Sequence, residues 1–182
     1  MELKTVYFEK PGGEENTAKT LALAKARAGE LGIKKVVVAS TVGDTAVKAV
    51  KVFNGYKVII VTHVTGFREP NTQEFTDENR KIVEKKGGII VTAAHAFGAI
   101  HHSLGATGDI ITMTLRTFGQ GMKVACEIAA MAADAGFVRT DEEIICIAGT
   151  GRGADTAVVL QPSNAQRFFN LKVKEIICKP RL

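Results

Sequence analysis

The sequence predicts a three-layer α/β/α fold, in which helices cover both faces of a mostly parallel mixed sheet. Strand-like and helix-like segments alternate along nearly the whole chain. The strand-like segments are continuous apolar runs, which is typical of strands buried on both faces. With 182 residues, of which 46% are hydrophobic, the chain can form one core. It is shorter than the roughly 250 residues of a complete (β/α)₈ barrel. We therefore expect a single domain over residues 1–182.

The first part of the chain is predicted to form two strands and a helix. Residues 6–8 make a short strand, and a glycine-containing loop leads to a helix over residues 17–31. Asn16 is a good N-cap for this helix, and Gly32 is a typical C-terminal stop. Residues 36–39 are apolar and mostly β-branched, which predicts a buried strand.

A short helix and another strand follow. The helix is expected to begin at Asp44 or Thr45 and to end at Gly55, where glycine favours termination. Residues 58–61 form the next continuous apolar run and predict a second buried strand. The residues that the helix is expected to bury are Ala46, Val47, Val50 and Phe53.

The helix predicted after Thr76 carries charges in the order that suits the helix macrodipole. Thr76 is its expected N-cap, Asp77 and Glu78 lie in its first turn, and two lysines lie in its last turn. Residues 89–91 form the following strand. Residues 92–119 predict no clear element, because glycines and threonines interrupt the apolar periodicity.

The last part of the chain is predicted to contain a long helix over residues 121–135 and three strands. The strands span residues 144–148, 158–160 and 173–178, and a capping-box pattern at residues 163–166 predicts a helix before the last strand. The buried stripe of the long helix is expected to comprise Val124, Ile128, Met131 and Ala135. The residues expected on its solvent face are Lys123, Glu127 and Asp134.

The loops after four of the predicted strands are small and carry hydroxyls or glycines. We expect the strands at 36–39, 58–61, 89–91 and 144–148 to be parallel and adjacent. Their loops then meet at the carboxyl edge of the sheet, where open α/β folds bind ligands. The candidate ligand-binding residues are Ser40, Thr41, Gly43, Asp44, Thr45, Thr62, His63, Thr65, Ala94, His95, Gly149, Thr150, Gly151, Arg152 and Gly153.

The loop at residues 40–45 has the features of a phosphate site. Its small residues let backbone N–H groups approach an anion, its hydroxyls add donors, and the following helix presents its positive end. We expect the Asp44 carboxylate to turn outward or to cap the helix. Arg152 is expected to add a charge-assisted hydrogen bond from across the site. On this hypothesis Gly43→Val weakens ligand binding with little effect on folding.

Both candidate loops also have a purely structural interpretation. Asp44 or Thr45 could serve only to cap the helix that follows. The glycines at residues 149–153 could form only a tight turn, because they lack the full spacing of a dinucleotide-binding loop.

No metal site, disulfide or nucleophile is predicted. His63 and His95 stand at strand ends and are interpreted as groups that contact a ligand, whereas His101 and His102 lie in a loop without supporting acidic residues. The three cysteines lie apart in apolar runs, so we expect buried, reduced thiols. The chain has no Gly-x-Ser-x-Gly motif, and no base for another nucleophile can be named from the sequence.

The composition argues against nucleic-acid and membrane partners. The net charge is only +5, aromatic residues make up 6%, and tryptophan is absent, so the side chains that stack on bases are scarce. No apolar run approaches the roughly 20 residues that span a bilayer. No apolar signal segment follows the first residues. We therefore expect a cytoplasmic protein with a small-molecule ligand.

Two sets of motifs resemble the C-terminal α/β domain of pyruvate kinase. VVVASTVGDTA at residues 36–46, followed by a helix and by KVIIVT at residues 57–62, resembles a strand–loop–helix–strand unit of that domain. LRTFGQG at residues 115–121 and GRGADTA at residues 151–157 resemble a stand-alone group of such domains, found largely in archaea.

The resemblance implies a mixed sheet with an antiparallel edge strand. In pyruvate kinase the loop that matches residues 40–45 belongs to an allosteric pocket for phosphorylated sugars. No pyruvate kinase activity is implied, because the catalytic barrel is absent. Members of the stand-alone group are expected to bind flavin mononucleotide (FMN). Pyruvate kinase uses this domain in subunit contacts, so we expect a homo-oligomer, most simply a two-fold dimer.

Three functions remain open. The first is binding of FMN or a similar phosphorylated ligand, either alone or as part of a flavin-dependent oxidoreductase. The second is regulation by a sugar phosphate. The third is catalysis on a small phosphorylated metabolite, with His63 or His95 as the acid–base group.

Overall fold

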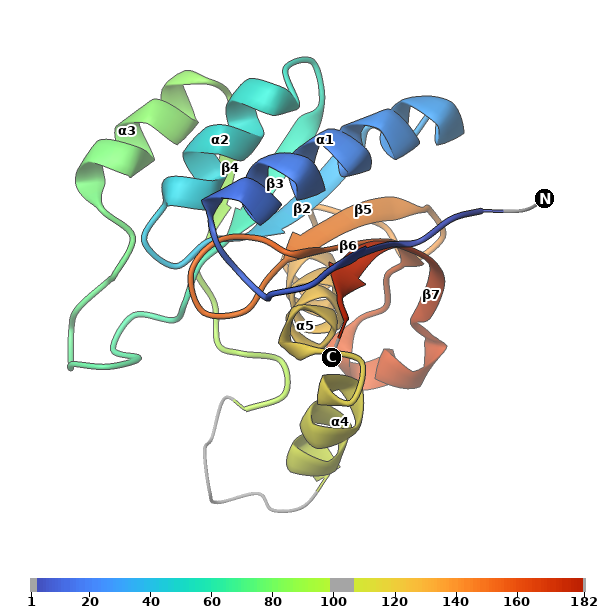
Figure 1. Ribbon diagram of the computed structural model, residues 1–182. Helices are drawn as coiled ribbons and strands as arrows, with labels where there is room; N and C mark the ends of the chain where they lie inside the picture. Colours follow the sequence, from blue (N-terminus) through green and yellow to red (C-terminus); the bar gives the residue numbers. More distant parts are fainter. Residues whose placement is uncertain (1–2, 99–106, 182) are drawn as a thin grey trace.

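A seven-stranded sheet lies between two layers of helices (Figure 1). The computed structural model describes residues 3–98 and 107–181. The strands are β1 (Val6–Phe8), β2 (Lys35–Ala39), β3 (Lys57–Val61), β4 (Ile89–Val91), β5 (Ile144–Ala148), β6 (Thr156–Gln161) and β7 (Lys172–Pro180). The helices are α1 (Glu14–Leu31), α2 (Asp44–Val52), α3 (Asp77–Lys85), α4 (Thr107–Arg116), α5 (Gln120–Asp134) and the 3₁₀ helix η1 (Ala165–Asn170). The predicted three-layer α/β/α class is confirmed.

The strands lie in the order β1-β7-β6-β5-β2-β3-β4. Strands β5, β2, β3 and β4 are parallel neighbours, so this prediction is confirmed. The predicted antiparallel edge strand is wrong, because the antiparallel strand is β6 in the interior of the sheet. The chain reverses through the short loop between β5 and β6, so β6 runs against both of its neighbours. Edge strands β1 and β4 each pair in parallel.

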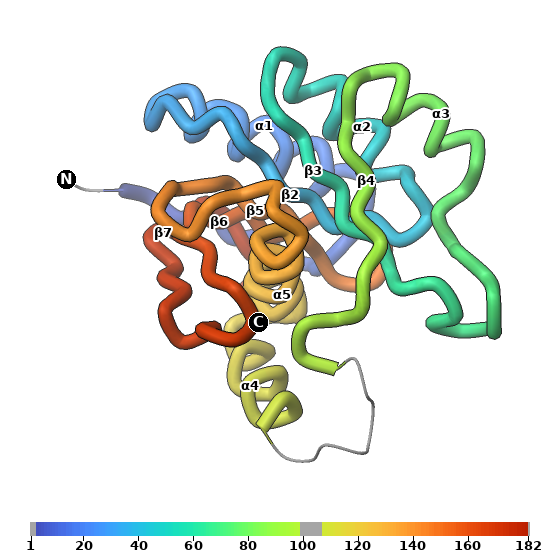
Figure 2. The backbone as a smooth tube through the Cα atoms, turned by 180° about the vertical axis from the view of Figure 1, so that it is seen from behind, coloured from blue at the N-terminus to red at the C-terminus, as the bar shows by residue number. Residues whose placement is uncertain are grey.

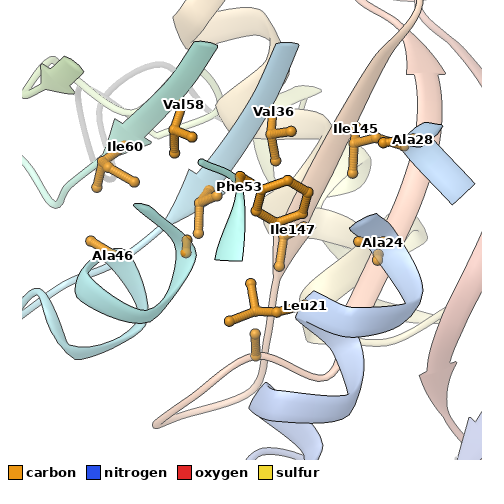
Figure 3. Close-up of a cluster of buried hydrophobic side chains, with 14 of the residues drawn as sticks. Leu21, Ala24, Ala28, Val36, Ala46, Phe53, Val58, Ile60, Ile145 and Ile147 are labelled. Atoms are coloured by element: carbon orange, nitrogen blue, oxygen red, sulfur yellow. The ribbon is translucent and has the colours of Figure 1, made fainter. Parts of the chain in front are cut away.

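Each central strand is buried on both faces, which explains its continuous apolar sequence. Helices α1, α2 and α3 cover one face, and α5 covers the other (Figures 1 and 2). In β2, Val36 and Val38 face the layer of α1, α2 and α3, whereas Val37 faces α5. Figure 3 shows Phe53, at the end of α2, packed among Val36 and Ile147 of the sheet.

Helix α1 begins earlier than predicted, and its N-cap is Gly13 rather than Asn16. The Gly13 N–H donates to the carbonyl oxygen of Arg152 at 3.0 Å, so a contact with a distant loop sets the start of the helix. The Asn16 side-chain amide instead donates to the carbonyl oxygen of Lys10 at 2.7 Å.

Helix α5 departs from its predicted amphipathic pattern. Lys123 and Glu127 were expected to face solvent, but they are only 9% and 5% exposed. Val124 is half-buried, and Ala135 lies just beyond the helix and is exposed. The cause is that α5 contacts α4 and η1 as well as four strands of the sheet, so it has no continuous solvent face.

Two segments near α5 form structure that the sequence did not predict correctly. The unassigned region 92–119 contains α4, a helix with no buried residue. The capping-box segment forms the 3₁₀ helix η1, and Asn164 makes no side-chain cap. The Ser163 hydroxyl donates to the carbonyl oxygen of Arg167 at 2.5 Å, so it closes the turn differently from a capping box.

Replacing Phe53 tests the core assignment. Phe53 is 1% exposed, so Phe53→Ala should lower the free energy of unfolding by about 3–5 kcal/mol. Phe169→Ala is the matched control, because Phe169 is 83% exposed and its loss should cost less than about 0.5 kcal/mol. Urea denaturation measures both values. Equal losses would contradict this assignment of the core.

The cysteines should be unreactive in the native protein. Burial raises the pKa of the Cys126 thiol to about 12 and that of Cys178 to about 11, and it also raises the pKa of Cys146. The folded state holds these protons to higher pH than the unfolded state. The resulting stability is therefore present below the ordinary thiol pKa of about 8.5 and is lost as pH rises toward the folded values.

A thiol-reactive dye at about pH 8 tests this expectation. The dye should label the cysteines only after the protein is unfolded in urea. Rapid labelling of the native protein would show that a thiol is accessible.

Candidate functional site

The loops after β2, β3, β4 and β5 line a cleft of about 1880 Å³. The cleft includes the point where the chain order of the sheet reverses: β3 and β4 extend from one side of β2, and β5 returns to its other side. Open α/β sheets bind ligands at this topological switch point.

Most of the candidate residues come together in this cleft. Those that line it are Ser40, Thr41, Asp44, Thr45, Thr62, His63, Ala94, His95, Gly149, Gly151, Arg152 and Gly153. The candidates absent from its lining are Gly43, Thr65 and Thr150. Parallel strand ends therefore brought together residues that are more than 100 positions apart in the chain.

The loop from β2 to α2 leaves two backbone donors at the N-terminus of the helix. The Ser40 hydroxyl accepts a hydrogen bond from the Ala46 N–H at 3.2 Å, which caps part of the first turn. Gly43, the N-cap residue, provides no side-chain cap. Within the described residues, no group accepts from the N–H of Asp44 or Thr45. These two amides and the positive end of α2 could receive an anion.

Gly43 is needed for packing rather than for contact with the cleft. Its φ is +109°, and a Cβ there would lie 2.4 Å from the Cβ of Asn79 in α3. The Asn79 amide also donates to the Val42 carbonyl oxygen at 3.0 Å. The expectation that Gly43→Val leaves folding nearly unchanged is therefore at odds with this packing, because the added side chain would separate the loop from α3.

Arg152 reaches across the site, as expected, but its observed partner is Asp44. The guanidinium contacts the Asp44 carboxylate at 2.5 Å, and the Asn79 amide approaches the other carboxylate oxygen at 3.4 Å. Asp44 is thus held by two side chains and does not cap its helix. Both members of the ion pair are partly exposed, so the pair contributes little stability. It does bring the loops after β2 and β5 together.

The glycine-rich loop after β5 is explained by packing around Asp155, a fully buried residue that sequence reasoning missed. Its carboxylate accepts from the N–H groups of Gly12 at 2.8 Å and Thr150 at 3.1 Å, and from the Thr156 hydroxyl at 2.7 Å. A Cβ on Gly149 would lie 2.4 Å from the Gly153 carbonyl oxygen. The structural interpretation therefore accounts for this loop's shape without a ligand.

His63 belongs to a hydrogen-bonded group that lines the cleft. Its Nδ1 is 2.8 Å from Oε2 of Glu74, and its Nε2 is 3.3 Å from the Thr41 hydroxyl. The other Glu74 oxygen is 3.1 Å from Nε of Arg68. Glu74 was not among the candidates, because it lies in a long loop without periodicity, eleven residues after His63 in sequence.

Three rings gather beside this group. The ring centroids of His63 and Phe67 are 4.3 Å apart, those of His63 and His95 are 5.5 Å apart, and those of Phe67 and His95 are 5.3 Å apart. Phe67 is 48% exposed. The rings therefore offer flat aromatic surface at the wall of the cleft.

The charged pair of α5 forms another part of the cleft wall. Lys123 Nζ lies 2.5 Å from Oε2 of Glu127 and 5.6 Å from the ring centroid of Phe97. The Phe97 N–H donates to the other Glu127 oxygen at 3.4 Å. The surrounding run of alanine and other apolar residues was the available signal that this helix, with its charges, is buried on most sides.

Cations at the α2 end of the cleft are Lys48 and Lys51. Lys48 pairs with Glu14 at 2.7 Å, and this hydrogen bond lowers the pKa of Glu14. Within the described residues, Lys51 has no ion-pair partner. This end of the cleft therefore favours an anionic group.

The described residues contain no group of three or more histidine, cysteine, aspartate or glutamate side chains that could hold a metal ion. His101 and His102 lie outside the described residues. In the part of the chain that the structure describes, no helix combines the length and the apolar character needed to cross a bilayer.

The fold and the cleft define a three-layer α/β domain with a ligand-sized cavity at the carboxyl edge of its parallel strands. The sequence matches the model of the family "Pyruvate kinase, alpha/beta domain" over residues 18–160, and the chain belongs to this family. The predicted resemblance to that domain is thereby confirmed. Membership of a stand-alone archaeal group stays a prediction.

The chain is also similar to a solved structure, Cryptosporidium parvum pyruvate kinase in complex with ADP. The two share 13% sequence identity, with a TM-score of 0.40, and the match covers 94% of this chain and 25% of that chain. The chain thus spans about a quarter of the length of that pyruvate kinase.

Substitution of Gly43 should destabilise the protein more than substitution of another left-handed glycine. Gly43→Ala combines a positive φ with a collision with Asn79, which together should cost about 2–4 kcal/mol. Gly55→Ala is the control, because Gly55 has a φ of +84° but nothing within 4 Å of an added Cβ. It should cost about 1–2 kcal/mol. Urea unfolding compares them, and equal costs would show that the contact with Asn79 is unimportant.

Proposed function

We propose that this chain binds a phosphorylated small molecule that carries a planar ring, and that FMN is such a ligand. The observation that carries this proposal is the presence, in one cleft, of an anion-accepting helix N-terminus and a cluster of exposed ring surface. FMN is the ligand that the resemblance to the stand-alone group of such domains implies, and it has a phosphate at one end and a planar ring at the other.

The phosphate end fits at α2. The N–H groups of Asp44 and Thr45 lie in the first turn of α2 without an acceptor among the described residues, and both residues line the cleft. Lys51 adds positive charge, and Arg152 offsets the negative charge of Asp44. A phosphate at this position would gain charge-assisted hydrogen bonds and the favourable end of the helix dipole.

The ring end fits the cluster of His63, Phe67 and His95. An isoalloxazine ring is flat and aromatic, and offset stacking on an exposed aromatic side chain contributes about 0.5–1.5 kcal/mol beyond area burial. The half-exposed Phe67 offers such a surface. When bound, FMN supplies electron-transfer chemistry; the residues named here would hold the phosphate and orient the ring.

A comparison of FMN with riboflavin tests both ends of the site. The fluorescence of FMN should be quenched when FMN binds. FMN should bind at least about tenfold more tightly than riboflavin, because riboflavin lacks the phosphate. Phe67→Ala should weaken FMN binding about two- to tenfold. Phe169→Ala, which removes an exposed phenylalanine outside the cleft lining, should bind FMN as the wild type does.

Equal affinities for FMN and riboflavin would contradict the proposal that the N-terminus of α2 binds the phosphate. If FMN does not bind but fructose bisphosphate does, the sugar-phosphate-sensing alternative replaces the flavin proposal. Isothermal titration calorimetry measures both ligands on the same preparation.

A further inference from the structure

Thr41, His63 and Glu74 form a continuous hydroxyl–imidazole–carboxylate chain. The Thr41 hydroxyl is 3.3 Å from Nε2 of His63, and Nδ1 of the same ring is 2.8 Å from Glu74. All three residues line the cleft. They come from two separate loops, since Thr41 follows β2 whereas His63 and Glu74 follow β3.

The direction of the Thr41–His63 hydrogen bond depends on the protonation state of the imidazole, because a hydroxyl can donate or accept. A carboxylate only accepts hydrogen bonds, so His63 donates its Nδ1–H to Glu74. In the neutral imidazole the lone pair is then on Nε2, which accepts a hydrogen bond from the Thr41 hydroxyl. This arrangement withdraws the hydroxyl proton toward a base, which is the general way in which proteins activate an alcohol as a nucleophile.

The surroundings hold the imidazole in this orientation. The Glu74 side chain is only 14% exposed, and Arg68 binds its second oxygen. The Phe67 ring packs on His63 at a centroid distance of 4.3 Å. The same roles of nucleophile, base and orienting carboxylate occur on unrelated folds in acyl-transfer enzymes, where they are recognised by geometry.

We propose that Thr41 is the nucleophile of an acyl-transfer site that hydrolyses small carboxylic esters or thioesters. The Thr41 oxygen attacks the carbonyl carbon while its proton passes to Nε2 of His63. The intermediate collapses, the bond to the leaving group breaks, and His63 returns the proton to that group. His63 then takes a proton from water, the resulting hydroxide attacks the acyl carbon, and the bond between that carbon and the Thr41 oxygen breaks. The acid leaves, and His63 returns the proton to the Thr41 oxygen.

Covalent labelling tests this proposal with probes that carry neither flavin nor phosphate monoester. Diisopropyl fluorophosphate should form an adduct on Thr41, in which a phosphorus–oxygen bond replaces the phosphorus–fluorine bond and fluoride leaves. Peptide mass spectrometry locates the adduct. The purified full chain should also hydrolyse p-nitrophenyl acetate, and labelling should abolish this activity.

The variants separate the chemical role of each residue from a structural role. Thr41→Ala should remove both the adduct and the hydrolysis, whereas Thr41→Ser should retain both because it keeps the hydroxyl. His63→Gln and Glu74→Gln should each slow labelling at least about tenfold. Thr140→Ala, an exposed threonine outside the cleft lining, should behave as the wild type.

Absence of an adduct on Thr41, or equal labelling in the His63→Gln protein, would overturn the proposal. An unfolding transition like that of the wild type, measured by circular dichroism, will show that the fold of each variant is intact. Labelling of Thr41→Ser tests the role of the hydroxyl in the variant that changes the side chain least. FMN binding is measured separately, so failure of the ligand proposal and failure of the nucleophile proposal give different results.

Discussion

The buried carboxylate of Asp155 is the interaction on which the arrangement of the site depends. Asp155 is fully buried, and a buried carboxylate is costly unless it accepts hydrogen bonds. Its donors come from Gly12, Thr150 and Thr156, so the loop before α1 and the loop after β5 have to pack together. A Cβ on Gly121 would lie 2.9 Å from the same carboxylate, so the start of α5 is fitted to it as well.

This packing determines where the loop after β5 can reach. Because the loop is held on one side by Asp155 and by the Gly13–Arg152 backbone hydrogen bond, the Arg152 side chain extends toward α2 and meets Asp44. The loop between β2 and α2, on the other side of the Asp44–Arg152 contact, is held by the Asn79 side chain of α3. The end of the cleft at the N-terminus of α2 is therefore built by contacts behind it, and its two open amides need no ligand to be positioned.

The strands and their order along the chain could be predicted because each contains its own signal. Continuous β-branched runs identify strands covered on both faces, and parallel neighbours place their following loops at one edge. This was enough to bring together Thr41, His63 and Arg152 from distant parts of the sequence. The helix with Thr76 at its N-cap was also predictable, because its capping hydrogen bond is local.

The features that were missed depend on contacts between distant segments. The start of α1 depends on a hydrogen bond to the Arg152 carbonyl, which no local pattern encodes. Burial of Lys123 and Glu127 follows from the elements that cover the second side of α5. Glu74 reaches His63 only because the long loop after β3 folds back on itself, and Asp155 gains its role from Gly12 far away in the sequence.

The outermost strands of the sheet are short: β1 and β4 have three residues each. An edge strand of that length exposes few backbone donors and acceptors to a neighbouring chain, and natural sheets use short edges to limit edge-to-edge aggregation. Extension of the sheet from one molecule into the next is therefore disfavoured along β1 and β4. Strand β7 extends beyond β1, and the charges that it carries there, on Lys172, Lys174 and Glu175, oppose edge pairing by another route. The strongly apolar strands β2, β3 and β5 thus lie inside the sheet, where no neighbouring chain can pair with them.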